Sequence, residues 1–138
     1  MKILNVAQTK AMLLATADAI IAAVPKLTEV DSRIGDGDHG VGMGGGMEKA
    51  KEALLKLDDS VDINALYKAM GMAMLNSMGG ASGVIFGTMF LGGVKGMPPV
   101  AELDCSLMAK MNRKSVDSIK QRGGAQVGDK TMVDAYEP

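Results

Sequence analysis

No charged residue occurs in the stretch Ala69-Met-Gly-Met-Ala-Met-Leu-Asn-Ser-Met-Gly-Gly-Ala-Ser-Gly-Val-Ile-Phe-Gly-Thr-Met-Phe-Leu-Gly-Gly-Val94. A membrane-spanning helix needs about 20 apolar residues, so this stretch is long enough to be considered for one. Its spacings Gly79–Gly83 and Gly83–Gly87 are also typical of packed membrane helices. However, four polar residues and seven glycines interrupt it, and Gly79-Gly80 divides it into two helices too short to span. We therefore favour two buried helices over a membrane span.

Apolar residues recur at helical spacings of three and four on both sides of this stretch. The predicted helices cover residues 6–24, 47–57, 63–78, 84–95 and 101–121. Pro25 should stop or kink the first of them, and Asp62 is suited to cap the third. Residues 26–46 are predicted to be a loop, which a short helical turn could lead into. Residues 42–46 could already belong to the next helix or could fray it, and no segment alternates as a strand would. The sequence therefore predicts an all-α, up-and-down protein with its function in the loops between helices.

Composition narrows the class of protein. A chain of 138 residues is long enough for one domain with its own core. The formal net charge of −1 gives no reason to expect nucleic acid or an anionic membrane as a partner. The single cysteine, Cys105, excludes a disulfide framework. Since the N-terminus also lacks a signal-peptide pattern, we expect a cytoplasmic protein.

The stretch Asp31-Ser-Arg-Ile-Gly-Asp-Gly-Asp-His-Gly40 gathers three carboxylates and the only histidine. No helix could place Asp31, Asp36 and Asp38 on one face, whereas a loop bent at glycines could turn all three inward. Converging carboxylates need a cation, and Mg²⁺ prefers oxygen ligands together with phosphates. Ordinary Asp-Gly turns or a Ca²⁺ site are the alternatives, although the terminal glutamate of an EF-hand is missing. The stretch predicts a magnesium–phosphate loop, in which His39 either donates to a phosphate or is structural.

Two further glycine clusters could bind phosphate. In Met78-Gly-Gly-Ala-Ser-Gly83, free N–H groups at a helix start and the Ser82 hydroxyl could hold an anion, or the turn could simply cap two helices. In Gly128-Asp-Lys-Thr-Met132, Lys130 could reach a phosphate, or the segment could be a polar turn with an N-cap. Neither cluster decides between these interpretations by itself.

Taken together and in this order, the three motifs closely resemble the nucleotide-binding subunit of dihydroxyacetone kinase, the DhaL family. The resemblance runs along nearly all of the chain, to Asp134. It implies an antiparallel helical barrel that binds ADP or ATP in the loops at one end. It also implies that Asp31, Asp36 and Asp38 ligate two Mg²⁺ ions that bridge the nucleotide phosphates.

The resemblance also implies which residues contact the nucleotide and which partners the chain has. The implied nucleotide contacts are His39, Gly40, Val41, Gly42, Ala81, Ser82, Gly123 and Met132. No catalytic side chain is expected here, because the general base should lie on a separate subunit that holds dihydroxyacetone. A stand-alone subunit favours the phosphotransferase-system type, in which a phosphohistidine protein recharges bound ADP. The alternatives are an ATP-dependent kinase of a related hydroxy-ketone or sugar acid, and a non-catalytic interaction module.

Family members continue with further helices, an arginine and a lid loop beyond the segment around Thr131. The resemblance therefore implies a single domain, 1–138, that is incomplete at its C-terminus. A barrel without its closing helices would expose an apolar seam, which predicts self-association, for example as a homodimer.

Overall fold

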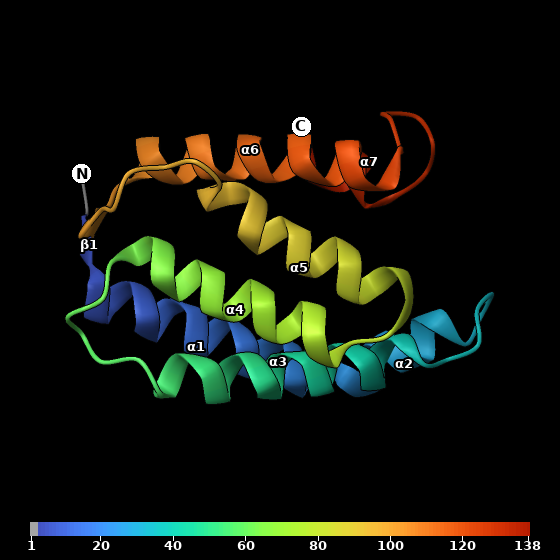
Figure 1. The fold of residues 1–138 in the computed structure, drawn as a ribbon. Coiled ribbons are helices and arrows are strands. Elements are labelled where there is room, and N and C mark those ends of the chain that lie inside the picture. Colours follow the sequence, from blue (N-terminus) through green and yellow to red (C-terminus); the bar gives the residue numbers. More distant parts are fainter. Residues whose placement is uncertain (1–2) are drawn as a thin grey trace.

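The computed structural model describes residues 3–138 as a stack of antiparallel helices (Figure 1). The helices are α1 (Val6–Ala22), α2 (Val24–Asp31), α3 (His39–Leu55), α4 (Ile63–Ser77), α5 (Gly80–Val94), α6 (Cys105–Gly123) and α7 (Met132–Tyr136). Two short strands, β1 (Leu4–Asn5) and β2 (Glu102–Leu103), pair antiparallel with Leu4 opposite Leu103. The predicted all-α class is confirmed. The two strands were not predicted, since two residues are too few for an alternating pattern.

Pro25 kinks the chain instead of ending the helical structure. α1 ends at Ala22 and α2 begins at Val24, with an angle of 51° between them. Proline is tolerated there because the first N–H groups of a helix have no partner inside it. The predicted loop over residues 26–46 is therefore wrong at both ends, and the observed loop is only residues 32–38.

α3 contains Gly42 to Gly46, which the sequence left undecided between loop and helix, and also Gly40, which was predicted to lie in the loop. Close packing explains why they are helical despite their low propensity. A methyl group at Gly44 would lie 2.7 Å from the side chain of Val24, and one at Gly40 would lie 2.8 Å from the backbone nitrogen of Thr28. These glycines let α2 and α3 pack closely, which fixes both ends of the acidic loop.

The uncharged stretch is divided as predicted. α4 ends at Ser77, and α5 begins at Gly80 rather than at the predicted residue 84. Gly80 has a φ of +65°, a conformation that favours glycine, where the chain turns between the helices. In the described residues no single helix is long and apolar enough to span a membrane, and only the bent pair of α1 and α2 meets that test together.

α5 packs between α4 and α6 through glycines on both of its faces (Figure 1). A methyl group at Gly71 of α4 would lie 2.9 Å from the carbonyl oxygen of Gly87 of α5. On the other face, one at Gly93 would lie 2.8 Å from the Ser115 hydroxyl of α6. The close approach buries a methionine-rich core that includes Met43, Met47, Met70, Met74, Phe90 and Met111.

The helix starts agree with ordinary capping chemistry. Asp62 accepts a hydrogen bond of 2.7 Å from the Ala65 N–H, as predicted. Asp104 accepts one of 2.7 Å from Leu107, so α6 begins at Cys105 and not at the predicted residue 101. These caps set the lengths of the helices and hence the loops that lie at each end of the stack.

The packing of α4 against α5 predicts opposite effects for two glycine substitutions. Gly71→Ala should lower the free energy of unfolding by about 1–3 kcal/mol, because the new methyl group meets backbone atoms that cannot move aside. Gly45→Ala, on the open face of α3 where nothing lies within 4 Å, should raise it by about 0.5–1 kcal/mol. Urea denaturation measures both values. Equal effects at the two positions would contradict the packing argument.

Candidate functional site

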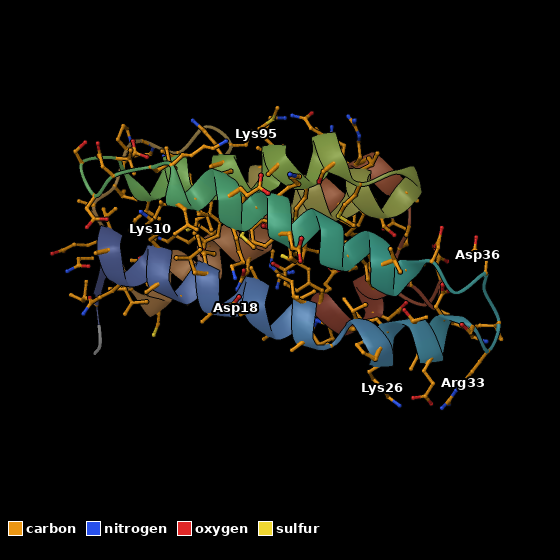
Figure 2. The ribbon with its side chains drawn as sticks, turned by 90° about the horizontal axis from the view of Figure 1, so that it is seen from below. Lys10, Asp18, Lys26, Arg33, Asp36 and Lys95 are labelled. Carbon is orange, nitrogen blue, oxygen red and sulfur yellow. The ribbon has the colours of Figure 1, made fainter. Side chains whose placement is uncertain are left out.

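Three segments that are distant in the sequence lie at one end of the helical stack. They are the loop 32–38, the turn between α4 and α5, and the loop between α6 and α7 (Figure 1). In Figure 2, Asp36 and Arg33 mark this end and Lys10 marks the opposite end. The three glycine-containing motifs of the sequence are therefore brought together, as their resemblance to one nucleotide site implied.

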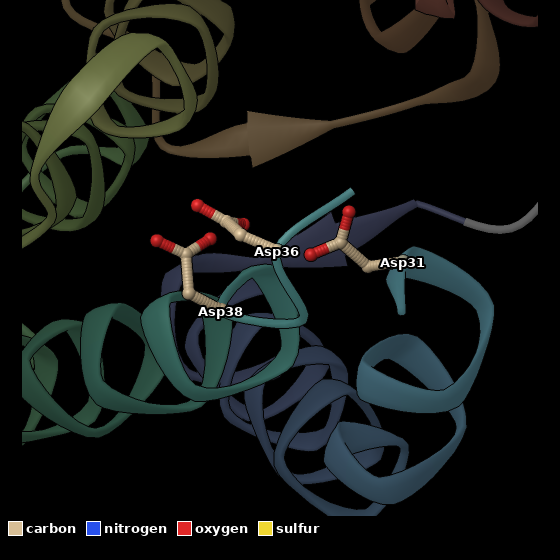
Figure 3. A group of neighbouring side chains, drawn as sticks. All are labelled: Asp31, Asp36 and Asp38. Atoms are coloured by element: carbon tan, nitrogen blue, oxygen red, sulfur yellow. The ribbon is translucent and has the colours of Figure 1, made fainter. Parts of the chain in front are cut away.

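Asp31, Asp36 and Asp38 converge in space (Figure 3). Each offers a carboxylate oxygen, and the three oxygens lie within 4.8 Å of one another. Asp31 is the last residue of α2 and Asp38 is the N-cap of α3, so the two helices position two of the three carboxylates. A side chain at Gly35 would collide with the Asp31 carboxylate, and Gly37 has a φ of +79°. The glycines therefore allow the loop to turn its carboxylates toward one another.

The carboxylates repel one another. Asp36, and to a smaller extent Asp31, raises the pKa of Asp38 because each negative charge disfavours another nearby. Asp31 also accepts a hydrogen bond of 3.2 Å from the His39 N–H, which joins the cluster to the start of α3. A set of oxygen donors with unbalanced negative charge fits a hard divalent cation such as Mg²⁺.

A cavity of about 390 Å³ lies beside this cluster, between the first turns of α3 and α5. It is lined by Asp38, His39, Gly42, Met78, Gly79, Gly80, Ala81 and Ser82. Neither helix is capped by the side chain of its own N-cap residue, so apart from the His39 N–H, which donates to Asp31, backbone N–H groups at these starts are left to bind a ligand. The Ser82 hydroxyl and His39 Nδ1 are 3.3 Å apart at its wall. Two helix N-termini with free N–H groups make this cavity suited to a phosphate.

A second, apolar cavity of about 340 Å³ continues from the first and shares Ala81 and Ser82 with it. Its other lining residues are Ile85, Phe86, Ile119, Gly123, Ala125, Thr131, Met132 and Val133. The Phe86 ring lies 6.1 Å from the His39 ring, so it stands between the two cavities. The dimensions and chemistry fit an aromatic base in the apolar cavity and phosphates in the other.

The structure places most of the predicted nucleotide contacts in these cavities. His39, Gly42, Ala81 and Ser82 line the first, and Gly123 and Met132 line the second. Gly40 and Val41 line neither, since Gly40 is packed against α2 and Val41 is 68% exposed. These two could reach a phosphate only through their backbone N–H groups, and their role stays a prediction.

Sequence reasoning missed the apolar lining of the second cavity. Ile85 and Phe86 come from α5, Ile119 from α6 and Val133 from α7. In the sequence they are ordinary apolar residues of helices. Only Ile85 and Phe86 could have been identified as site residues, because they lie one turn after Ser82. A helix that starts at a phosphate-binding turn places its second turn beside whatever the phosphate carries.

The segment 128–134 is a capped turn. Thr131 is the N-cap of α7, and its hydroxyl accepts from the Val133 N–H at 3.2 Å. Asp134 accepts hydrogen bonds from the N–H groups of Gly128, at 2.6 Å, and Thr131, at 3.0 Å, and these bonds lower its pKa. The capping interpretation of this motif is confirmed, and the turn also brings Met132 to the apolar cavity.

The repulsion predicts that a carboxylate can be removed with a gain in stability when no metal is present. Asp36→Asn should raise the melting temperature at neutral pH in a chelator. The gain should fade as the pH is lowered, and should begin to fade above the usual range of an aspartate, because Asp38, whose pKa is raised in the folded state, then takes up a proton and the repulsion disappears. In Mg²⁺ the order should reverse, since only the wild type gains stability from the ion. Thermal unfolding measures all three effects.

Asp59→Asn is the matched control, because Asp59 is an exposed aspartate of the loop between α3 and α4, away from the cluster. It should leave the response to Mg²⁺ unchanged. If Asp36→Asn and Asp59→Asn behaved alike in chelator and in Mg²⁺, the cluster would not be a cation site.

Comparison with known proteins agrees with this geometry. Residues 33–138 match the family model of the DAK2 domain. The chain is 40% identical over 112 residues to the ADP-binding subunit DhaL of the PEP-dependent dihydroxyacetone kinase of Escherichia coli, a match that covers 81% of this chain and 53% of that protein. It is 35% identical over 125 residues to D-erythrulose kinase of Mycolicibacterium smegmatis, covering 90% of this chain and 22% of that one.

Among solved structures, the fold is similar to that of dihydroxyacetone kinase from C. freundii in complex with AMP-PNP and Mg²⁺. The TM-score is 0.77 at 23% identity, and the match covers 96% of this chain and 24% of that one. The chain spans about half the length of the DhaL subunits that it matches. The family match over residues 33–138, together with the shared fold, establishes that the chain belongs to the DAK2 domain family.

Proposed function

We propose that this chain is a nucleotide- and magnesium-binding subunit of a dihydroxyacetone kinase. It would hold ADP or ATP so that a phosphoryl group passes to dihydroxyacetone on a partner subunit. One observation is the main support for the proposal. Three converging carboxylates lie beside a cavity at two helix N-termini, and an apolar cavity adjoins that one. The names of the DhaL relatives support the same activity.

Asp31, Asp36 and Asp38 would hold the metal, and two Mg²⁺ ions is the number that the resemblance implies. When bound, Mg²⁺ supplies positive charge that neutralises the carboxylates and the nucleotide phosphates together. Ser82 and His39 would donate to phosphate oxygens, beside the free N–H groups of α3 and α5. The apolar cavity would hold the base and so fix the direction in which the phosphates point.

Phosphoryl transfer depends mainly on positioning and charge neutralisation, and the chain's residues supply both. The start of α5 orients the phosphates, because Ala81 and Ser82 line both cavities. We assign no general base to this chain and place it on the partner that holds the hydroxyl acceptor. The open end of the helical stack leaves the phosphates accessible to that partner.

The phosphotransferase-system type is the favoured mode. The Escherichia coli relative is called the ADP-binding subunit of a PEP-dependent kinase, and the two proteins align over 81% of this chain. In this mode ADP stays bound, and a phosphohistidine protein recharges it between turnovers. The proposed partners are therefore a dihydroxyacetone-binding kinase subunit and a phosphohistidine donor.

A related hydroxy-ketone is the second candidate substrate. The observation in its favour is the 35% identity to D-erythrulose kinase over 125 residues. Because the acceptor would bind to the partner, this chain does not select between the two sugars. Turnover assays with each sugar and the partner subunit native to this chain distinguish them, and any turnover excludes a purely non-catalytic interaction module.

Isothermal titration calorimetry with ADP, with and without Mg²⁺, tests the proposal. Wild type should bind ADP more tightly in Mg²⁺, and Asp36→Asn should lose at least about tenfold of that affinity, because a ligand of the metal is gone. Asp59→Asn should bind like wild type. If ADP binding were equally tight in Asp36→Asn, the carboxylates would not hold the metal. If wild type bound no ADP at all, the proposed function would be wrong.

A second prediction tests whether the apolar cavity binds the base while the other cavity binds the phosphates. Met132→Ala should weaken ADP binding several-fold, because the base loses apolar contact, yet leave binding of Mg²⁺–pyrophosphate unchanged. Leu55→Ala, at an exposed apolar residue of α3 that lines neither cavity, should change neither affinity. Competition calorimetry measures both ligands. Equal loss for ADP and pyrophosphate would show that the base does not lie in the apolar cavity.

A further inference from the structure

A cavity larger than either cavity of the nucleotide site lies outside that site. It is an open groove of about 750 Å³ on the outer face of α4, α5 and α6. It is lined by Lys68, Met72, Leu75, Thr88, Leu91, Gly92, Lys95, Gly96, Ser118, Gln121 and Arg122. None of these residues lines either cavity of the nucleotide site. In Figure 2, Lys95 lies well away from Asp36.

All charged side chains that line this outer groove are positive. Lys68, Lys95 and Arg122 line it, one from each helix or its end, and no carboxylate does. α4 and α5 together contain a single charged residue, Lys68. None of the three cations forms an ion pair within residues 3–138, although six other ion pairs occur there. An anion would therefore find three cations without competing carboxylates.

The floor of the outer groove is apolar. Leu75 and Leu91 contribute to it, and Met72 is 45% exposed. Gly92 lets α6 approach α5 closely beside this floor, since a methyl group there would collide with the Ser118 side chain. Thr88, Ser118 and Gln121 add hydrogen-bonding groups beside this floor. A volume in the range of 300–1,000 Å³, an apolar floor and a few polar groups are the features of small-molecule sites.

Neither the helix dipole nor pairing with a second copy of the chain explains why these three cations lie together. Lys95 caps α5 and Arg122 lies in the last turn of α6, where the helix dipole favours positive charge. Lys68, however, lies within α4, five residues after its start and nine before its end, where the dipole has little effect. Pairing with a second copy of the same face is also disfavoured, because an isologous contact would bring cation against cation.

We propose that the outer groove is a second ligand site, for an organic anion that carries an apolar body. The apolar body lies on Met72, Leu75 and Leu91, and the anionic group lies between Lys68 and Lys95. This site is separate from nucleotide binding and stands whether or not the proposed kinase function is correct.

The probe is 8-anilinonaphthalene-1-sulfonate, an aromatic anion, and its uncharged counterpart is N-phenyl-1-naphthylamine. Methionine labelled with ¹³C at the methyl group provides a reporter in each cavity: Met72 in the outer groove, Met78 in the cavity between the starts of α3 and α5, and Met132 in the apolar cavity. Titration followed by NMR shows which cavity the probe enters, with resonances assigned from single Met→Leu variants. The anion should shift Met72 at lower concentration than Met78 or Met132, and the uncharged counterpart should shift Met72 more weakly.

A charge-matched pair of double variants tests the cations. Lys68→Gln with Lys95→Gln should weaken the Met72 response to the anion at least about tenfold. Lys56→Gln with Lys110→Gln, which removes the same charge from exposed lysines outside the outer groove, should leave the response within about twofold of wild type. Unchanged circular dichroism confirms that both fold.

Three results would overturn the proposal. The first is a probe that shifts Met78 or Met132 but not Met72. The second is equal affinity for the uncharged naphthylamine, which would leave no role for the cations. The third is equal weakening in both double variants, which would mean that only the net charge of the protein matters.

Discussion

Close packing of helices at glycine is the constraint on which this structure depends. α5 lies between α4 and α6, and it touches both through glycines, at Gly87 and Gly93. α2 and α3 pack in the same way at Gly40. A side chain at any of these positions would push a helix outward. The starts of α3 and α5 would then no longer face one cavity, because their directions are set by the helices on which they pack.

Glycine within a helix lowers its stability by roughly 0.5–1 kcal/mol relative to alanine, so the packing must offset that loss. Methionine is the partner that makes this possible. Met78 lies against the open side of Gly46, and Met43, Met47, Met70 and Met74 fill the adjoining core. Flexible, unbranched side chains can fill the irregular spaces that glycines leave between helices. The glycines within these helices and the methionines of the core therefore serve the same close packing.

The helical class and the carboxylate cluster could be predicted because each depends on local patterns. Helical periodicity marked α4, and the glycines between Asp31, Asp36 and Asp38 indicated a loop whose carboxylates converge. The limits of α3 could not be predicted, because Gly40 is helical only through its contact with α2, which lies outside the local sequence. The apolar cavity was missed for the same reason. Ile85, Ile119 and Val133 become one surface only after three helices have packed, and nothing in the spacing of these residues states that they meet.

The electrostatics of the site favour a ligand with charge of both signs. The N-termini of α3 and α5 present the positive ends of peptide dipoles to the cavity between them, and these attract an anion and repel a cation. The adjacent carboxylates do the reverse, and their mutual repulsion already raises the pKa of Asp38. An anion alone would be repelled by the carboxylates, and a cation alone would be repelled by the positive helix ends. A divalent cation bound to a polyphosphate satisfies both, with its cation toward Asp31, Asp36 and Asp38 and its phosphates toward Ser82. Each half of such a ligand removes the repulsion that the other half would meet, so we infer that metal and nucleotide bind cooperatively.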